Sequence, residues 1–319
     1  MIEMLSPAFV SEPLFAAPRL ISAPLAAGLP ARQSAANSEN SADLFKGRRI
    51  HFMGAGGIGV SALMELCAAR GAVVSGCDCS GGGQVPALRA RGIQIETGHC
   101  ASHVEDCDEL VYTAAVDQSH PEVQHAQRLG KEITVRMRML GKIARGTRGI
   151  CVTGAHGKTT TTWLIANMLI AAGRDPSVLL GGVVNAMNGN VRIGRGSEFV
   201  AEVDESDNRL HEVIPGIQVL TNIDNDHLEH YGSVDNIERA ALRFMRSLDK
   251  SDPQSILIGC GDDVRVRSVL ATASTQSRRP YIAYGFGWHC QGRGMNLRRE
   301  GLDWRFDVLT PSSLWADVL

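Results

Sequence analysis

Residues 49–59, with the sequence RIHFMGAGGIG, join an apolar segment to a glycine-rich turn. An alanine- and leucine-rich segment from Val60 to Arg70 follows the turn, and Gly71 ends it. The next apolar segment, Ala72 to Gly76, is typical of a second strand. The order of strand, glycine turn, helix and strand opens a βαβ unit. We therefore expect a Rossmann-like parallel sheet in this part of the chain.

A second α/β unit is predicted further along the chain. Its first strand spans Gly149 to Thr153, a glycine-containing turn follows, and a helix spans about Thr161 to Ala172. Other apolar segments with strand character lie at 109–113, 132–135, 198–201, 218–223 and 255–258. Strands that alternate with helices favour parallel sheets. The expected architecture is an α/β protein with a Rossmann-like domain at residues 46–148 and a P-loop-type domain at residues 149–319.

Residues 1–45 differ from the rest in composition, with several prolines, many Ala and Ser and no periodic apolar face. We predict a disordered extension. Arg19 and Arg32 among serines are also typical of an organellar transit peptide, whereas Glu3 and Glu12 are not. A bland extension and a misassigned start codon are the alternatives.

Charge and composition limit the classes of function. The 319 residues contain 32 Lys plus Arg against 34 Asp plus Glu, a net charge of −2, which lacks the cationic excess of a nucleic-acid-binding protein. Apolar stretches fall short of the roughly 20 residues that a membrane-spanning helix needs. The eight scattered cysteines are typical of a reducing compartment. We expect a cytoplasmic protein without membrane insertion; self-association into a homo-oligomer stays open.

The first motif, Gly54-x-Gly56-x-x-Gly59, lies between a strand and a helix, and Asp78 ends the next strand. Glycines permit a tight turn and close approach of backbone N–H groups to a diphosphate, which the helix N-terminus attracts. The motif by itself is compatible with NAD, with a UDP-sugar and with a plain strand-to-helix turn.

The second motif has the features of a phosphate-binding loop. It comprises Gly154, Ala155, His156, Gly157, Lys158, Thr159 and Thr160 and is two residues shorter than the usual G-x-x-x-x-G-K-[ST] loop. Lys158 is expected to reach the β- and γ-phosphates of ATP, and the Thr159 hydroxyl is expected to bind Mg²⁺. The alternative is a Gly-Lys-Thr sequence that only begins a helix.

Two further polar segments follow apolar strands, at 202–207 and 224–227. Because the carboxyl ends of parallel strands meet at one edge of a sheet, Glu202 and His227 are expected beside the phosphate loop, where they would complete the Mg²⁺ shell. The alternatives are a solvated acidic loop for Glu202 and a capping or core histidine for His227.

Cysteines and histidines gather between residues 77 and 107 without a zinc pattern. Cys77 and Cys79 precede His99, Cys100, His103 and Cys107, but no C-x-x-C pair occurs. We expect buried thiols rather than a zinc site. The other histidines, including His120, His125 and His211, have no companion motif and are expected at the surface.

The motifs together resemble those of the Mur ligases of peptidoglycan synthesis. Four segments carry the resemblance: HFMGAGGIGVS at 51–61, TGAHGKTTTT at 153–162, AEVDESD at 201–207 and TNIDNDHLEHY at 221–231. Ala155 stands where the family usually has Thr. The similarity covers about Lys46 to Asp263.

The resemblance implies a ligase that joins L-alanine to UDP-N-acetylmuramate through an acyl phosphate, with ATP and Mg²⁺. The first domain would then hold a UDP-sugar rather than NAD, on Gly56, Gly57, Ile58, Gly59, Ser61, Asp78 and Thr113. Lys158, Glu202 and His227 would be catalytic, and Thr159, Glu202 and His227 would bind the metal.

Two departures from the family pattern leave alternatives open. Arg138 occupies the position at which the family's R-x-E-M-L segment has Glu, so that contact to the sugar nucleotide is in question. The chain ends at Leu319, before the family's third domain. A nucleotide-binding remnant without catalysis and the sibling ligase that recycles muramate peptides are therefore kept as alternatives, and NAD-dependent oxidoreduction is a third.

Overall fold

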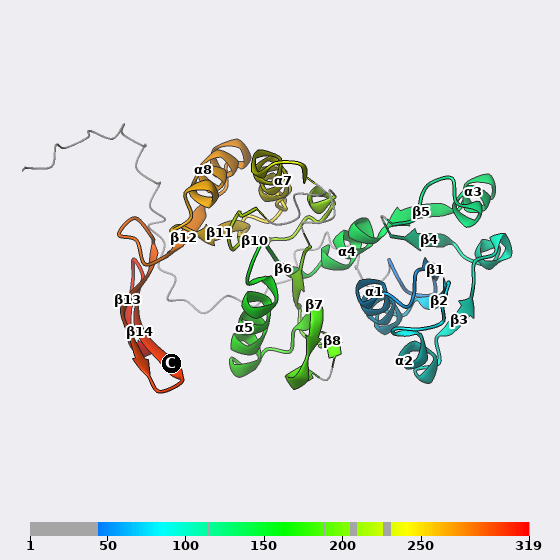
Figure 1. The fold of residues 1–319 in the computed structure, drawn as a ribbon, viewed down its shortest axis with the longest axis horizontal. Coiled ribbons are helices and arrows are strands. Elements are labelled where there is room, and N and C mark those ends of the chain that lie inside the picture. Colours follow the sequence, from blue (N-terminus) through cyan, green and yellow to red (C-terminus); the bar gives the residue numbers. More distant parts are fainter. Residues whose placement is uncertain (1–43, 114, 188, 205–208, 226–230, 319) are drawn as a thin grey trace, which may run out of the picture.

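The computed structural model describes residues 44–113, 115–187, 189–204, 209–225 and 231–318 (Figure 1). The predicted position of His227 and nearly all of the predicted N-terminal extension lie outside these residues. Two α/β units follow each other in the sequence, each built on its own sheet.

The first sheet has five parallel strands in the order β3-β2-β1-β4-β5. The strands are β1 (Arg49–Met53), β2 (Val73–Asp78), β3 (Gln94–Thr97), β4 (Glu109–Tyr112) and β5 (Glu132–Val135). Its helices are α1 (Ile58–Ala69), α2 (Val85–Ala90), α3 (Pro121–Arg128) and α4 (Arg136–Ala144), with a short 3-10 helix at Ala101–Val104. This arrangement confirms the Rossmann-like prediction.

The second sheet has ten strands in the order β15-β14-β13-β12-β11-β10-β6-β9-β7-β8. Its strands are β6 (Arg148–Thr153), β7 (Ser177–Val184), β8 (Gly189–Arg192), β9 (Glu198–Glu202), β10 (Ile217–Leu220), β11 (Ile256–Cys260), β12 (Tyr281–Gly285), β13 (Gly292–Glu300), β14 (Asp303–Leu309) and β15 (Leu314–Val318). The helices are α5 (Lys158–Ala171), α7 (Val234–Arg246) and α8 (Val264–Ser277), with 3-10 turns at Asn185–Met187 and Leu210–Glu212. Figure 1 shows β13 and β14 as a long hairpin at the end far from the first unit.

The neighbours in the consecutive part of this sheet from β13 through β12, β11, β10, β6 and β9 to β7 pair in parallel. Antiparallel pairing is confined to the two edges, where β8 pairs with β7, β14 with β13 and β15 with β14. The central strands are continuous apolar segments because helices cover both faces, which is what parallel sheets require. The predicted α/β fold class is confirmed for this unit too.

Two elements begin or end at other residues than predicted, and both differences lie beside the phosphate loop. The helix expected from Thr161 begins at Lys158, directly after the phosphate loop. The strand expected to reach Ile223 ends at Leu220, because Thr221 and Asn222 turn toward His156 instead of continuing the ladder.

The two units share one hydrophobic core. The largest buried cluster includes Phe52 and Leu63 from the first unit together with Phe199 and Phe244 from the second. Helix α4 lies between the two sheets (Figure 1). Within the described residues no helix has both the length and the apolarity needed to cross a bilayer. The division at residue 148 stays a prediction.

Candidate active site

The glycine turn between β1 and α1 is held by Asp78 at the end of β2. The Gly56 N–H donates to Asp78 Oδ2 over 2.9 Å, and a Cβ at Gly56 would lie 2.8 Å from that oxygen. Gly54 has a φ of +78°, which favours glycine. The turn therefore needs glycine at both positions, and the backbone N–H groups at the start of α1 remain directed at the space above it.

Asp78 is committed to this turn. Its Oδ1 accepts hydrogen bonds from the Ser80 N–H and from the Ser80 hydroxyl, each at 3.0 Å. Partial burial tends to raise the pKa of Asp78, but the hydrogen bonds from Ser80 and Gly56 outweigh it and lower this pKa. Asp78 is thus an ionised carboxylate that braces the turn.

The other residues predicted to bind a UDP-sugar surround the same turn. Gly57 is the N-cap of α1 and Ile58 its first residue. A Cβ at Gly54 would lie 3.6 Å from Thr113 Cγ2, which places Thr113 against the turn. The buried Ser61 hydroxyl donates to Ile58 O over 3.0 Å. Their role as ligand-binding residues stays a prediction.

Arg136 lies outside both glycine-containing motifs of the sequence but reaches the first of them. A Cβ at Gly59 would lie 2.5 Å from Arg136 Nη1, so the guanidinium lies over the first turn of α1. A planar cation there suits a diphosphate. Arg136 begins α4 directly after the end of β5. Because ligands gather at the carboxyl ends of parallel strands, its place after a predicted strand could have identified it as a ligand-binding residue.

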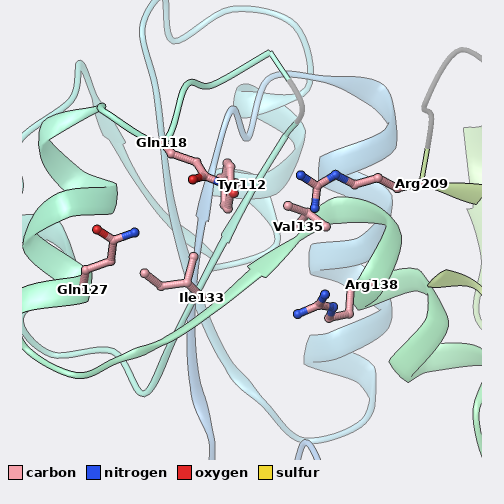
Figure 2. Close-up of a pocket in the computed structure, with 7 residues that line it drawn as sticks. All are labelled: Tyr112, Gln118, Gln127, Ile133, Val135, Arg138 and Arg209. Atoms are coloured by element: carbon pink, nitrogen blue, oxygen red, sulfur yellow. The ribbon is translucent and has the colours of Figure 1, made fainter.

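A cleft opens beside the turn, between the ends of β4 and β5 and the second unit. It has a volume of about 390 Å³, and Tyr112, Gln118, Val135 and Arg209 are among the residues that line it. Figure 2 shows the adjoining part, which Arg138 of α4 and Arg209 of the second unit approach from the same side. Arg138 Nε lies 3.3 Å from Glu212 Oε2, so the residue that departs from the family pattern forms an ion pair between the units.

The phosphate loop lies at the carboxyl end of β6. Gly157 has a φ of +77°, and a Cβ at Gly154 would lie 2.2 Å from Thr221 Oγ1, so glycine is required at both positions. Lys158 Nζ donates to Gly154 O and Ala155 O, at 2.8 and 3.1 Å. The ammonium group therefore sits inside the loop, where a phosphate ligand would meet it.

Two residues following β10 close the loop from the other side. Thr221 Oγ1 donates to His156 O over 2.8 Å, and the His156 N–H donates to Asn222 Oδ1 over the same distance. His156 Nε2 lies 3.3 Å from Asp224 Oδ2. The backbone N–H of Asn225 and then His156 lower the pKa of Asp224. Thr221 and Asn222 are therefore positioning residues for the loop, a role that the sequence pattern by itself does not indicate.

Glu202 and Thr159 meet, as the carboxyl-edge argument predicts. Thr159 Oγ1 donates to Glu202 Oε2 over 2.8 Å, and the Gly181 N–H donates to the same oxygen over 2.8 Å. A hydroxyl and a carboxylate beside a phosphate loop are hard oxygen donors of the kind that Mg²⁺ takes. The residues present thus fit a magnesium ion. Thr160 follows Thr159 in the first turn of α5, and His227 lies outside the described residues.

Comparison with known proteins identifies the family. Residues 49–148 match the Mur ligase family, catalytic domain, and residues 152–311 match the Mur ligase middle domain. The chain belongs to the Mur ligase family.

Several curated relatives share more than a third of their aligned residues with the chain. A protein of Aromatoleum aromaticum named UDP-N-acetylmuramate--L-alanine ligase is 38% identical over 264 residues, which are 83% of this chain and 55% of that protein. A protein of the same name from Dichelobacter nodosus is 38% identical over 82% of this chain and 54% of its own length. The chain therefore spans about half the length of the curated relatives it matches.

Solved structures show the same architecture. UDP-N-acetylmuramate-alanine ligase from Thermotoga maritima is 27% identical with a TM-score of 0.66, covering 85% of this chain and 60% of that chain. A ligase from Neisseria meningitides named UDP-N-acetylmuramate:L-alanyl-gamma-D-glutamyl-meso-diaminopimelate ligase has a TM-score of 0.71 at 22% identity, covering 84% of this chain and 86% of that chain. The second likeness concerns the fold alone.

Proposed function

We propose that this chain supplies the UDP-sugar-binding and ATP-binding parts of a cytoplasmic ligase that joins L-alanine to UDP-N-acetylmuramate in peptidoglycan synthesis. The observation that carries the proposal is the pairing of Thr159 with Glu202 beside a loop that encloses Lys158. An oxidoreductase has no use for this arrangement. The names of the 38% identical relatives support the choice of substrates.

The proposed reaction begins when the lactyl carboxylate of the muramate attacks the γ-phosphorus of ATP. An oxygen–phosphorus bond forms, the bond to ADP breaks, and an acyl phosphate results. The amine of L-alanine then attacks the acyl carbon, phosphate leaves, a proton is lost and an amide remains. Two anions must approach in the first step, so Lys158 is expected to offset their repulsion.

Magnesium, when bound, would neutralise charge on the transferred phosphoryl group. Thr159 and Glu202 would hold it, with His227 proposed as a further ligand. In the first unit, the backbone N–H groups at the start of α1 and the Arg136 guanidinium would bind the diphosphate. The adjoining cleft with Arg138 and Arg209 would hold the remainder of the UDP-sugar.

The first test separates the two sites by equilibrium binding. Lys158→Ala is expected to weaken MgATP binding by about 10- to 150-fold, the equivalent of the roughly 1.5–3 kcal/mol that a hydrogen bond to a charged group contributes. UDP-N-acetylmuramate binding should be unchanged, because the sugar nucleotide occupies the other unit. Lys250→Ala, which removes an exposed lysine, is the matched control. Equal ATP affinity in the Lys158 variant would contradict the proposed role of the loop.

Turnover decides between the ligase and the two alternatives that share its fold. Phosphate release with ATP, Mg²⁺, UDP-N-acetylmuramate and L-alanine, abolished by Lys158→Ala, supports the ligase. Release that depends on an L-alanine-started peptide instead of L-alanine identifies the recycling ligase. Binding of the UDP-sugar without turnover means either a fragment of a ligase or a binding remnant.

A further inference from the structure

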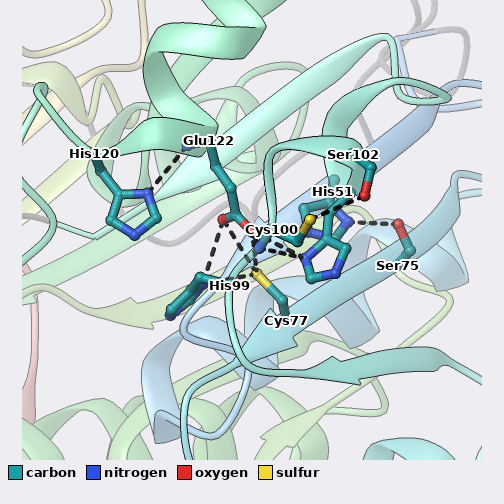
Figure 3. A network of polar contacts seen from close by, with 9 residues as sticks. His51, Ser75, Cys77, His99, Cys100, Ser102, His120 and Glu122 are labelled. Carbon is teal, nitrogen blue, oxygen red and sulfur yellow. Dashed lines mark hydrogen bonds and ion pairs between the residues drawn. The ribbon is translucent and has the colours of Figure 1, made fainter.

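Five chemically active side chains gather behind the glycine turn, apart from the phosphate and sugar sites. His51 is on β1, Cys77 on β2, His99 follows β3, and His103 and Glu122 lie on the 3-10 helix and on α3. Figure 3 shows His51, Cys77, His99 and Glu122 turned toward one another. We call these five residues the histidine–cysteine cluster. The proposed ligase reaction uses none of them.

Three ligand atoms of the cluster form a triangle of nearly equal edges. Cys77 Sγ lies 3.2 Å from His99 Nδ1 and 3.4 Å from Glu122 Oε2, and these last two atoms are 3.3 Å apart. Bond lengths of about 2.0–2.3 Å in a tetrahedral zinc site place pairs of such ligands roughly 3.4–3.6 Å apart. One face of a zinc coordination tetrahedron is therefore already formed, with edges short by a few tenths of an ångström.

The carboxylate of Glu122 is held so that one oxygen faces this triangle. Its Oε1 accepts hydrogen bonds from the Cys100 N–H at 2.7 Å and from His103 Nδ1 at 2.9 Å. Oε2 is directed at Cys77 and His99. Metal-binding carboxylates are commonly oriented in this way by hydrogen bonds behind them. Glu122 is also 0% exposed, and a buried carboxylate gains from a nearby positive charge.

His51 gives an independent indication of a ligand. It is 2% exposed, its Nδ1 is 2.9 Å from Ser75 Oγ, and its Nε2 has no hydrogen-bond partner. A ring nitrogen of His51 lies within 4.8 Å of the ligand atoms of Cys77 and His103. A buried imidazole nitrogen without a partner costs free energy unless it binds something. The other ring nitrogen, Nδ1, is hydrogen-bonded to Ser75 and so holds the orientation of the ring. In metal-bound histidines the nitrogen that does not bind the metal is usually held by a hydrogen bond in the same way.

We propose that Cys77, His99 and Glu122 bind a zinc ion. The His51 ring, which lies within 4.8 Å of the Cys77 sulfur but not of the His99 and Glu122 ligand atoms as well, would have to shift toward this triangle to become the fourth ligand. A set of one sulfur, two imidazole nitrogens and one carboxylate oxygen suits zinc and excludes magnesium, which takes oxygen. On binding, the Cys77 thiol releases its proton to solvent and the sulfur–metal bond forms. The His99 side chain is 26% exposed and provides the path of entry.

The ion would brace the sugar-nucleotide turn. The carbonyl of Cys77 accepts hydrogen bonds from the N–H groups of Gly54 and Ala55, at 2.9 and 3.1 Å. A metal bond to the side chain of the same residue ties the end of β2 to α3 and so fixes the strand against which the turn rests. The site is structural, because four protein ligands leave no open position.

The test is a titration of the metal-free full chain with CoCl₂, followed by ZnCl₂. One equivalent of Co²⁺ is expected to give a sulfur-to-cobalt charge-transfer band in the near ultraviolet and visible bands of a tetrahedral ion, and one equivalent of Zn²⁺ should remove them. Cys77→Ser should abolish the charge-transfer band. His99→Gln should weaken binding at least about 10-fold, as loss of even an outer-shell partner does.

Cys79→Ser is the matched control, because Cys79 is an exposed thiol two residues away and should leave the band unchanged. Circular dichroism establishes that each variant is folded; if Cys77→Ser is not, the partly exposed His99→Gln variant decides. The proposal is overturned by the absence of a saturable band in the natural chain, by a band that survives Cys77→Ser, by its loss in Cys79→Ser, or by unchanged affinity in His99→Gln.

Discussion

At the scale of single residues, Asp78 shows how a motif residue can serve the backbone. The dinucleotide pattern leaves open a carboxylate that holds a ribose hydroxyl. In the structure both oxygens of Asp78 accept hydrogen bonds, one from Gly56 and one from Ser80. This commitment agrees with membership of the Mur ligase family rather than with an NAD-dependent enzyme.

The role of Asp78 has a pH signature. Asp78→Asn is expected to lower the free energy of unfolding at pH 7 by about 1–3 kcal/mol, because partly buried donors lose a charged acceptor. A carboxyl whose folded-state pKa is lowered contributes stability above its unfolded pKa of about 3.9 and loses it as the pH falls through the folded pKa. The difference between the two proteins should therefore be constant from pH 7 to 5 and shrink below about pH 3.9.

Urea unfolding of both proteins at several pH values measures this difference. Asp117→Asn is the control, since the Asp117 carboxylate accepts a hydrogen bond from the Ser119 N–H in an exposed loop and its loss should change stability little. A difference that stays constant down to pH 3 would show that the charge of Asp78 is not what holds the turn.

At the scale of secondary structure elements, α4 is the element on which the two units meet. A Cβ at Gly141 would lie 2.4 Å from the carbonyl oxygen of Glu212, in the 3-10 turn Leu210–Glu212 of the second unit. The neighbouring atom is backbone and cannot rotate away. The close approach of helix and turn therefore depends on glycine.

Gly141→Ala is expected to destabilise the protein by about 1–3 kcal/mol, the usual cost of overpacking. Helix propensity alone predicts the opposite sign, a gain of up to about 1 kcal/mol, so the direction of the change is decisive. Thermal and urea unfolding give the measurement. Gly182→Ala, where a Cβ would meet nothing within 4 Å, is the matched control. A Gly141→Ala protein more stable than the natural chain would mean that α4 does not pack this closely.

At the scale of the whole molecule, the two units are joined by contacts of polar side chains in addition to their shared hydrophobic core. Asn190 on β8 donates to Ile58 O at the start of α1 over 3.1 Å and to Leu180 O of its own unit over 3.3 Å. Arg70 at the end of α1 donates to Ile143 O, and its guanidinium lies over the rings of Phe45 and Phe199. Burial lowers the pKa of Arg70. The second unit thus contacts the helix that begins at the sugar-nucleotide turn.

Asn190→Ala tests whether the contact between Asn190 and Ile58 affects ligand binding at the sugar-nucleotide site. The variant is expected to lose about 1–3 kcal/mol of unfolding free energy, because the buried carbonyls lose a donor. UDP-N-acetylmuramate should also bind several-fold more weakly, because Ile58 loses its anchor. Calorimetric titration and urea unfolding measure the two effects. Asn167→Ala, which removes a bond within α5, is the control for binding. Unchanged affinity of Asn190→Ala for UDP-N-acetylmuramate would show that the contact between the units does not affect the sugar-nucleotide site.

The sequence by itself determined the fold class, the family and the order of the two units. Those properties depend on local patterns: the glycine turn after β1, the loop from Gly154 to Lys158, and apolar strands of the length that parallel sheets need. The meeting of Thr159 with Glu202, 43 residues apart, was also predictable, because carboxyl ends of parallel strands share an edge. His227 lies outside the described residues, so its role remains a prediction.

Only the tertiary structure decided the rest. The antiparallel edge strands β14 and β15 and the packing of α4 on Glu212 left no periodic signal of their own, because such edge strands and interface glycines are selected by non-local contacts. His120, expected at the surface without a role, accepts the Glu122 N–H and caps α3. Cys77, His99 and Glu122 match no zinc spacing, since they come from three elements. The packing of β2, the segment after β3 and α3 against one another brings these three side chains together. Their spacing in the sequence does not indicate how close they lie.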